Sequence, residues 1–145
     1  GNPKVFPFTK PKVPDLNFSF SGLKTQILYF IQKNVAINPN FVEENKADIC
    51  ASIQYTIIEI LMDKLKLAVA ETGINQIAIG GGVSANSGIR STLKEAEKKY
   101  GWKTYIPKFE YTTDNAAMIG IVGYYNFLEE NFSDADVVSK ARIEF

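Results

Sequence analysis

The sequence predicts an α/β domain in which helices cover a small sheet. Short apolar runs that resemble strands alternate with longer segments whose apolar residues recur at helical spacing. Glycine-rich or polar turns separate the two kinds of segment. The length of 145 residues and the hydrophobic fraction of 46% fit one packed domain. Strands that alternate with helices indicate at least some parallel pairing, with right-handed crossovers.

Composition excludes several function classes. The chain has no histidine and one cysteine, Cys50. These counts exclude a Ser-His-Asp triad, a Cys-His pair, a histidine-ligated zinc, a histidine pH switch, an internal disulfide and a thiolate metal cluster. We expect no signal peptide, and no apolar run approaches the roughly 20 residues that span a bilayer. The chain begins at Gly1 rather than at methionine, and we therefore expect it to be part of a longer protein.

The formal net charge is zero, but the charges are unevenly distributed. Residues 1–42 have five lysines and one aspartate, a net charge of +4, and the remainder has a net charge of −4. The amino-terminal stretch is therefore either a surface that faces an anion such as nucleic acid or a solvated loop with scattered lysines.

The first 42 residues predict an extended segment, a strand and a helix. Four prolines within residues 1–15 exclude a helix or central strand there, and Phe6 and Phe8 are candidates to pin the segment. Leu16–Ser21 alternates apolar and polar side chains and predicts a short strand that Gly22 ends. A helix of about three turns follows, and then a turn at 38–40.

The longest predicted element is a helix over residues 43–71, which Gly73 ends in a left-handed cap. Cys50 lies near its apolar stripe and is expected to be an inert buried thiol. We expect that stripe to face the core; its members are Ile49, Ile53, Ile57, Ile60, Leu61, Leu65 and Ala68.

The second half predicts two strands and two helices. The strands are residues 76–79 and 103–106, and the helices run from the glycine turn to about Tyr100 and over 116–128. Residues 131–145 are polar and poorly periodic, and predict a carboxyl-terminal tail that lies on the surface.

The turn Gly80–Asn86 is the first candidate site. Three glycines after an apolar strand allow positive φ and a close approach of the backbone to a ligand, and the next helix presents unpaired N–H groups. The turn is neither a Walker A loop nor a dinucleotide-binding fingerprint. A tight turn with a serine or asparagine cap explains the same residues.

Two further turns are candidates. Asp114 precedes an apolar helix, and it is either a helix cap or a monodentate metal ligand at the carboxyl end of a strand. Ser19–Thr25 combines hydroxyls, a glycine and Lys24, which form either an anion-binding nest or an ordinary turn. Because all three turns lie at strand ends or helix starts, we expect them to border one crevice.

Three segments together resemble a known family. They are Phe18–Thr25, Gly81–Asn86 and Thr113–Ile119. In this order and spacing they resemble the tRNA N6-adenosine threonylcarbamoyltransferases, formerly described as glycoproteases. The resemblance covers about residues 1–126. It implies one lobe of the actin, hexokinase and Hsp70-like (RNase H-like) ATPase fold, and the carboxyl-terminal portion of a bacterial member.

The resemblance also implies a reaction and roles for residues. The family transfers threonylcarbamoyl from threonylcarbamoyl-adenylate to N6 of adenosine 37 in tRNAs that read ANN codons. By this resemblance Asn86, Gly81, Gly82 and Ser84 contact the adenylate. Asp114 is one ligand of a divalent metal, iron or zinc, with magnesium as an alternative. Lys10, Lys12 and Lys24 are candidates for tRNA phosphate contacts.

The resemblance implies two protein partners, a shorter paralogue of the same fold and a small P-loop ATPase. It also implies that the protein is cytoplasmic and does not bind a membrane. The family's HxxxH metal motif and its upstream glycine-rich loops have no counterpart in this sequence. We therefore expect residues 1–130 to form a fragment of the carboxyl-terminal lobe, residues 131–145 to be a tail, and the chain by itself to be inactive. Exposed sheet edges predict some self-association.

Two alternatives remain open. One is a scaffold or binding lobe of the same superfamily that has no chemistry. The other is a small-metabolite kinase of that superfamily, against which the Ser19–Thr25 segment argues.

Overall fold

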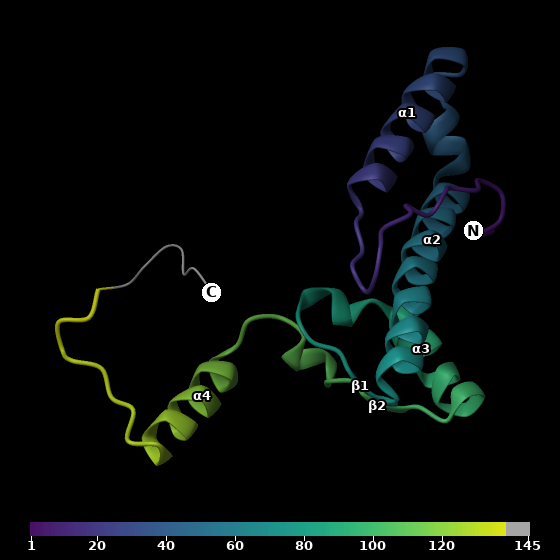
Figure 1. The fold of residues 1–145 in the computed structure, drawn as a ribbon. Coiled ribbons are helices and arrows are strands. Elements are labelled where there is room, and N and C mark those ends of the chain that lie inside the picture. Colours follow the sequence, from purple (N-terminus) through teal and green to yellow (C-terminus); the bar gives the residue numbers. More distant parts are fainter. Residues whose placement is uncertain (139–145) are drawn as a thin grey trace.

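The computed structural model describes residues 1–138 and shows helices joined to a small parallel sheet (Figure 1). The α-helices and strands, in chain order, are α1 (Ser21–Ile37), α2 (Phe41–Thr72), β1 (Gln76–Ala78), α3 (Ser87–Tyr100), β2 (Lys103–Tyr105) and α4 (Ala116–Leu128). Short 3₁₀ turns lie at Gly82–Ala85 and Phe109–Tyr111. The α/β class predicted from the sequence is confirmed.

The two strands are parallel, with Ile77 opposite Thr104, and α3 makes the crossover between them. Their side chains alternate between two faces of the sheet. Ile77 is buried on one face, whereas Lys103 and Tyr105 lie on the exposed opposite face. The buried side joins α2 and α3 in one hydrophobic core, made of Met62, Ile77, Ile89, Leu93, Ala96 and Trp102.

The prediction of a long second helix is confirmed, and Gly73 ends it with φ of 70°. Within the predicted stripe, Ile49 and Ile60 are buried, and the other members are half-buried. The prediction for Cys50 is wrong, because this thiol is exposed. Position 50 follows the buried Ile49, so one step of about 100° around the helix moves its side chain off the buried face.

The amino-terminal segment is extended as predicted, and aromatic contacts hold it against α1 and α2. The Phe6 and Phe8 rings lie 5.1 and 5.4 Å from the Phe30 ring, and Phe6 also packs on Phe41 at 5.8 Å. The backbone N–H of Thr9 donates to Gln26 Oε1, and Gln26 Nε2 donates to the Thr9 carbonyl. Phe6 and Phe8 therefore pin the segment, as the sequence predicts.

The predicted strand at Leu16–Ser21 is wrong. Residues 16–20 are neither helix nor strand, and α1 already begins at Ser21, with Gly22 inside it. A strand requires a neighbouring strand for its hydrogen bonds, and the described residues pair only β1 with β2. The Phe18 and Phe20 rings instead pack edge to face at 5.7 Å and line a groove described below.

The last helix, α4, stands apart from the rest of the fold (Figure 1). It has no buried residue, although most of its side chains are apolar and none is charged. No helix in residues 1–138 is long and apolar enough to span a bilayer. Residues 131–138 are exposed and contain no helix or strand. The rest of the predicted tail, residues 139–145, lies outside the described residues.

Candidate functional site

The glycine turn follows β1 and leads into α3. Gly81 has φ of 77°, in the left-handed region that favours glycine, and a Cβ there would meet no atom within 4 Å. The backbone N–H and the hydroxyl of Ser84 both donate to the Gly81 carbonyl, at 2.9 and 2.7 Å. Ser84 is buried, so its hydroxyl holds the turn closed, whereas Gly81 and Gly82 present exposed backbone.

Asn86 caps α3. Its Oδ1 accepts a hydrogen bond of 3.1 Å from the Ile89 N–H, and its Nδ2 donates to Gln54 Oε1 of α2 at 3.3 Å. Gly88, in the first turn of α3, lies against the same side chain of α2: an added Cβ would come within 2.9 Å of Gln54 Nε2. The capping role left open for this turn is therefore confirmed, and the cap fixes the orientation of the Asn86 amide.

Arg90 was missed by the sequence analysis. Its Nη1 donates to the Ser84 carbonyl at 3.0 Å, and its Nη2 donates to the Pro107 carbonyl at 2.7 Å. Arg90 thus joins the loop after β1 to the loop after β2. The sequence has no signal for this role, because both acceptors are backbone carbonyls that any residue presents.

A groove of about 590 Å³ is lined by residues of two of the three predicted turns. Phe18, Phe20 and Lys24 line it from the first of these turns, and Val83 and Asn86 line it from the second. The remaining lining side chains are apolar: Leu23, Ile27, Ile57, Leu61 and Ile89. The motifs Phe18–Thr25 and Gly81–Asn86 are therefore neighbours in space, although nearly 60 residues separate them in the chain. A mostly apolar groove with a few polar groups is typical of a small-molecule site.

The third turn does not line that groove. Asp114 is exposed, and no ion pair joins it to another residue in the described range 1–138. Asn115, not Asp114, caps α4, because Asn115 Oδ1 accepts from the Met118 N–H at 3.3 Å. The capping interpretation of Asp114 is therefore wrong: only the next residue has its side chain over the exposed N–H groups.

A metal site requires several donor side chains close together. Residues 1–138 contain no group of three histidine, cysteine, aspartate or glutamate side chains that could hold a metal ion. Protein metal sites commonly use about three protein ligands, and one exposed carboxylate supplies one. The residues described here do not fit a complete metal site.

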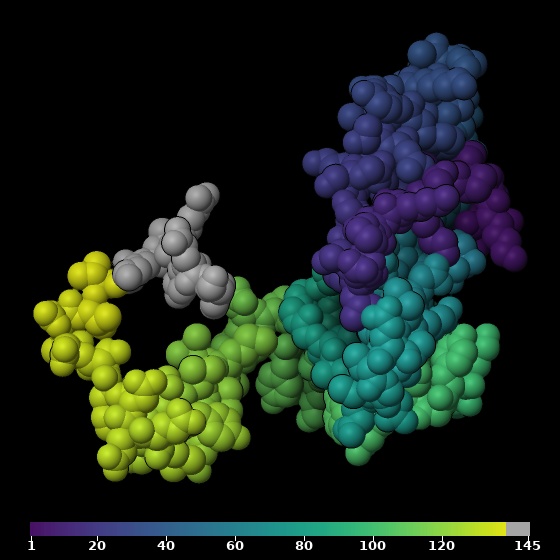
Figure 2. Space-filling model, viewed as in Figure 1, coloured from purple at the N-terminus to yellow at the C-terminus, as the bar shows by residue number. Residues whose placement is uncertain are grey.

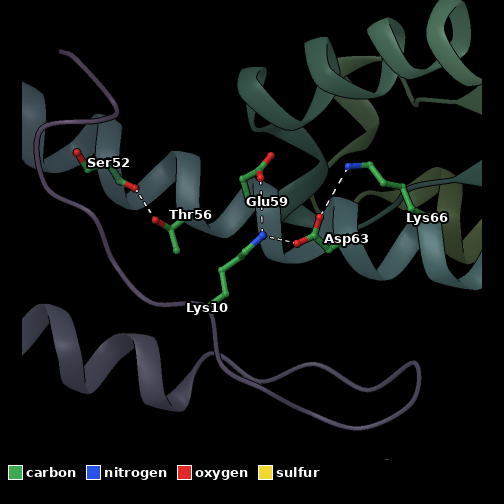
Figure 3. A network of polar contacts seen from close by, with 6 residues as sticks. All are labelled: Lys10, Ser52, Thr56, Glu59, Asp63 and Lys66. Carbon is green, nitrogen blue, oxygen red and sulfur yellow. Dashed lines mark hydrogen bonds and ion pairs between the residues drawn. The ribbon is translucent and has the colours of Figure 1, made fainter.

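The three candidate lysines have different surroundings. Lys10 Nζ forms an ion pair with Asp63 and lies 3.7 Å from Glu59 Oε2 (Figure 3). The hydrogen bond to Asp63 raises the pKa of Lys10 above its usual value. Lys12 and Lys24 are exposed, and Lys24 borders the groove. Of the three, Lys10 is therefore already engaged with α2.

The chain was compared with known proteins. The family model TsaD, tRNA N6-adenosine threonylcarbamoyltransferase, matches residues 1–121. A tRNA N6-adenosine threonylcarbamoyltransferase of Christiangramia forsetii is 65% identical over 145 residues, which are 100% of this chain and 43% of that protein. Proteins with the same name from Cytophaga hutchinsonii and Clostridium beijerinckii are 50% and 40% identical, each over 99% of this chain and 42% of its own length.

The chain thus spans about two fifths of the length of the curated relatives that it matches. The family match covers Phe18–Thr25 and Gly81–Asn86, the two segments that both contribute residues to the groove. It also includes Asp114. The chain belongs to the tRNA N6-adenosine threonylcarbamoyltransferase family.

Proposed function

We propose that this chain is part of an enzyme that transfers a threonylcarbamoyl group from threonylcarbamoyl-adenylate to N6 of adenosine 37 in tRNAs that read ANN codons. Its relatives, which are more than twice as long, are named for transfer to N6 of adenosine in tRNA. The observation that carries the proposal is the groove between Phe18–Thr25 and Gly81–Asn86, two segments that bear the family resemblance. Its apolar walls suit the face of a purine ring.

In this proposal the chain is the carboxyl-terminal portion of the enzyme and contributes to one lobe of the actin, hexokinase and Hsp70-like fold, with residues 1–130 in the lobe and 131–145 as a tail. Gly81, Gly82 and Ser84 shape the turn against the adenylate. Exposed backbone at the two glycines allows a close approach, and Asn86 lies on the groove wall. Acyl transfer from a mixed anhydride releases AMP, whose phosphate would approach the amino-terminal end of α3.

The metal is proposed for the longer protein. Asp114 would supply one ligand to a divalent ion, iron or zinc with magnesium as an alternative, and the other ligands would come from outside this chain. Such an ion would stabilise negative charge on the phosphate or carbonyl. The described residues form no complete set of ligands. For the same reason we propose that the chain alone is inactive.

The proposed partners are tRNA, a shorter paralogue of the same fold and a small P-loop ATPase, in the cytoplasm. Lys12 and Lys24 are the exposed candidates for phosphate contacts. The unpaired edges of a two-stranded sheet also favour self-association of the isolated chain.

The test is transfer by the longer protein that contains this chain. Purified protein would be incubated with its partners, threonylcarbamoyl-adenylate and unmodified tRNA, and the modified nucleoside would be measured by mass spectrometry after digestion. Asn86→Asp keeps an oxygen acceptor for the Ile89 N–H but removes the amide donor, so helix α3 is retained and transfer falls. Asn131→Asp, an exposed change three residues after the end of α4, is the matched control and leaves transfer unchanged.

Absence of modified nucleoside with the unaltered protein, in the presence of all partners, would contradict the proposed activity. Retained binding of the partners in that case would favour the alternative of a scaffold lobe without chemistry. Phosphorylation of a small metabolite would instead favour the kinase alternative.

A further inference from the structure

The side-chain amide of Gln54, on α2, lies beside the Asn86 amide at the start of α3. Asn86 Nδ2 donates to Gln54 Oε1 at 3.3 Å, and this hydrogen bond joins residues that are 32 positions apart in the chain. The two helices pack against each other, and in Figure 2 the green α3 segment adjoins the teal part of α2. Gln54 lies outside both segments that carry the family resemblance and line the groove.

Hydrogen bonds fix which end of each amide faces its partner. Asn86 Oδ1 accepts from the Ile89 N–H at 3.1 Å, which leaves Nδ2 as the end that donates. Gln54 supplies the acceptor, Oε1, for that donor. An amide nitrogen has two hydrogens, so the bond to Gln54 leaves one of them for a ligand. Gln54 therefore restricts the rotation of the Asn86 side chain and the direction of its remaining donor.

Gly88 allows the two helices to approach each other at this point. A Cβ at position 88 would lie 2.7 Å from Ile58 Cδ1, 2.9 Å from Gln54 Nε2 and 3.2 Å from Asn86 Oδ1. The first two distances are too short for nonbonded atoms, so a side chain there would displace the Gln54 amide and the Ile58 methyl group. The approach that brings Gln54 within reach of Asn86 therefore depends on glycine at position 88.

Asn86 lines two cavities, the groove of about 590 Å³ and a smaller cavity of about 240 Å³. Of these two, Gln54 lines only the smaller one. An effect of Gln54 on a ligand in the groove would therefore pass through Asn86.

We propose that Gln54 is a positioning residue that holds the Asn86 amide ready for the adenosine part of the substrate. The inference rests on the proposed function, in which Asn86 contacts the adenylate. A side chain that is already held in its binding orientation loses less conformational entropy when the ligand arrives. Loss of the Gln54 acceptor should therefore weaken binding of the adenylate. The same loss should hardly affect folding, because an exposed hydrogen bond of this length contributes little to stability.

The experiment compares variants of the longer protein that contains this chain, by two measurements. Steady-state transfer gives kcat and the KM for threonylcarbamoyl-adenylate, and titration calorimetry gives the Kd for AMP without tRNA or protein partners. Gln54→Met has a similar length but no oxygen acceptor, and it raises KM and Kd about fivefold. Its kcat changes less than about twofold, because only ground-state binding is weakened.

Two further variants separate positioning from a general structural effect. Gln54→Glu keeps an oxygen acceptor for Asn86 Nδ2 and restores KM and Kd to within about twofold of the unaltered protein. Gln32→Met, an exposed change on α1, is the matched control and alters neither quantity. Gln54→Met and Gln32→Met unfold at the same urea concentration.

A double-variant comparison shows whether Gln54 acts through Asn86. Asn86→Asp keeps an acceptor for the Ile89 N–H but removes the amide donor that reaches Gln54. In the Asn86→Asp background, Gln54→Met should therefore leave KM and Kd unchanged.

Equal effects of Gln54→Met in the two backgrounds, or no effect in either, would contradict the positioning role. Failure of the unaltered protein to bind AMP would also overturn it, because Asn86 would then have no adenosine ligand to hold. Absent transfer with the expected pattern of AMP binding contradicts the proposed function alone. Normal transfer with unchanged KM and Kd in Gln54→Met contradicts the positioning role alone.

Discussion

Arg90 Nη2 donates a hydrogen bond of 2.7 Å to the Pro107 carbonyl, while Nη1 of the same guanidinium donates to the Ser84 carbonyl at 3.0 Å. One side chain of α3 thereby joins the two loops that leave the carboxyl ends of β1 and β2. In α/β sheets this end is where ligands bind. The shape of the glycine turn therefore depends on a residue that does not belong to it.

Replacing Arg90 with glutamine is expected to lower the free energy of unfolding by about 2 kcal/mol, because two hydrogen bonds to a charged donor are lost. Lysine at this position keeps the charge but cannot fork between two carbonyls, so Arg90→Lys is also destabilising. Urea denaturation followed by circular dichroism measures the change. Lys94→Gln, on the exposed face of the same helix, is the control; an equal loss there would contradict the role of Arg90.

The left-handed cap at Gly73 predicts a conformational penalty for larger residues. Its φ is 70°, and a Cβ there would meet no atom within 4 Å, so any effect of Gly73→Ala comes from the backbone and not from a clash. We expect Gly73→Ala to lower the free energy of unfolding by about 1 kcal/mol and Gly73→Asn to lower it less. Gly80→Ala, at an open position without positive φ, is the matched control. Equal stability of the Gly73→Ala and Gly80→Ala variants would contradict the argument.

The hydrogen bonds of Glu97 lead us to expect that the free energy of unfolding depends on pH. The hydroxyl and backbone N–H of Thr104 donate to Glu97 Oε1 at 2.6 and 3.0 Å, and these hydrogen bonds hold the pKa of the carboxyl below its ordinary value of about 4.5. Because the folded-state pKa is lowered, the stabilisation is present above the ordinary value and is lost as pH falls through the folded-state value.

The free energy of unfolding of the unaltered chain should therefore exceed that of Glu97→Gln near neutral pH, and the difference should shrink as pH falls below about 4.5. Urea titrations across this range measure it. Glu95→Gln, two residues earlier and exposed, is the comparison. A difference that stayed constant over the whole range would show that ionisation of Glu97 is not responsible.

Phe30 is the centre of the aromatic cluster that holds the amino-terminal segment. It contacts the rings of Phe6, Phe8 and Phe41 at 5.1, 5.4 and 5.7 Å. We expect Phe30→Ala to lower the free energy of unfolding by about 3 kcal/mol and to speed proteolytic cleavage within residues 1–20. Phe109→Ala, at a ring that is 71% exposed, should change neither measurement appreciably. Unchanged cleavage in Phe30→Ala would show that the cluster does not hold the segment.

Helices with strong local signals were predicted well. The period of the apolar residues predicted α2 and α3 closely, because helical hydrogen bonds are local. Gly73 was predicted to end α2 in a left-handed cap, a conformation that favours glycine, and it does so. The strand at Leu16–Ser21 was predicted from its alternation and does not form, because a strand depends on a partner that the alternation does not specify. Cys50 was predicted to be buried but is exposed. At the edge of the buried stripe, one position along the helix is enough to turn a side chain from the core to solvent.

The sequence by itself determined the α/β class, the ends of α2 and α3, the family and the three motif segments. The tertiary structure alone decided that Phe18–Thr25 and Gly81–Asn86 border one groove, that Arg90 joins the loops after both strands, and that Asn115 rather than Asp114 caps α4. The physical reason is the range of the interactions. Helix periodicity and glycine caps act within a few residues, whereas a groove wall or a hydrogen bond to a distant carbonyl depends on how the whole chain packs.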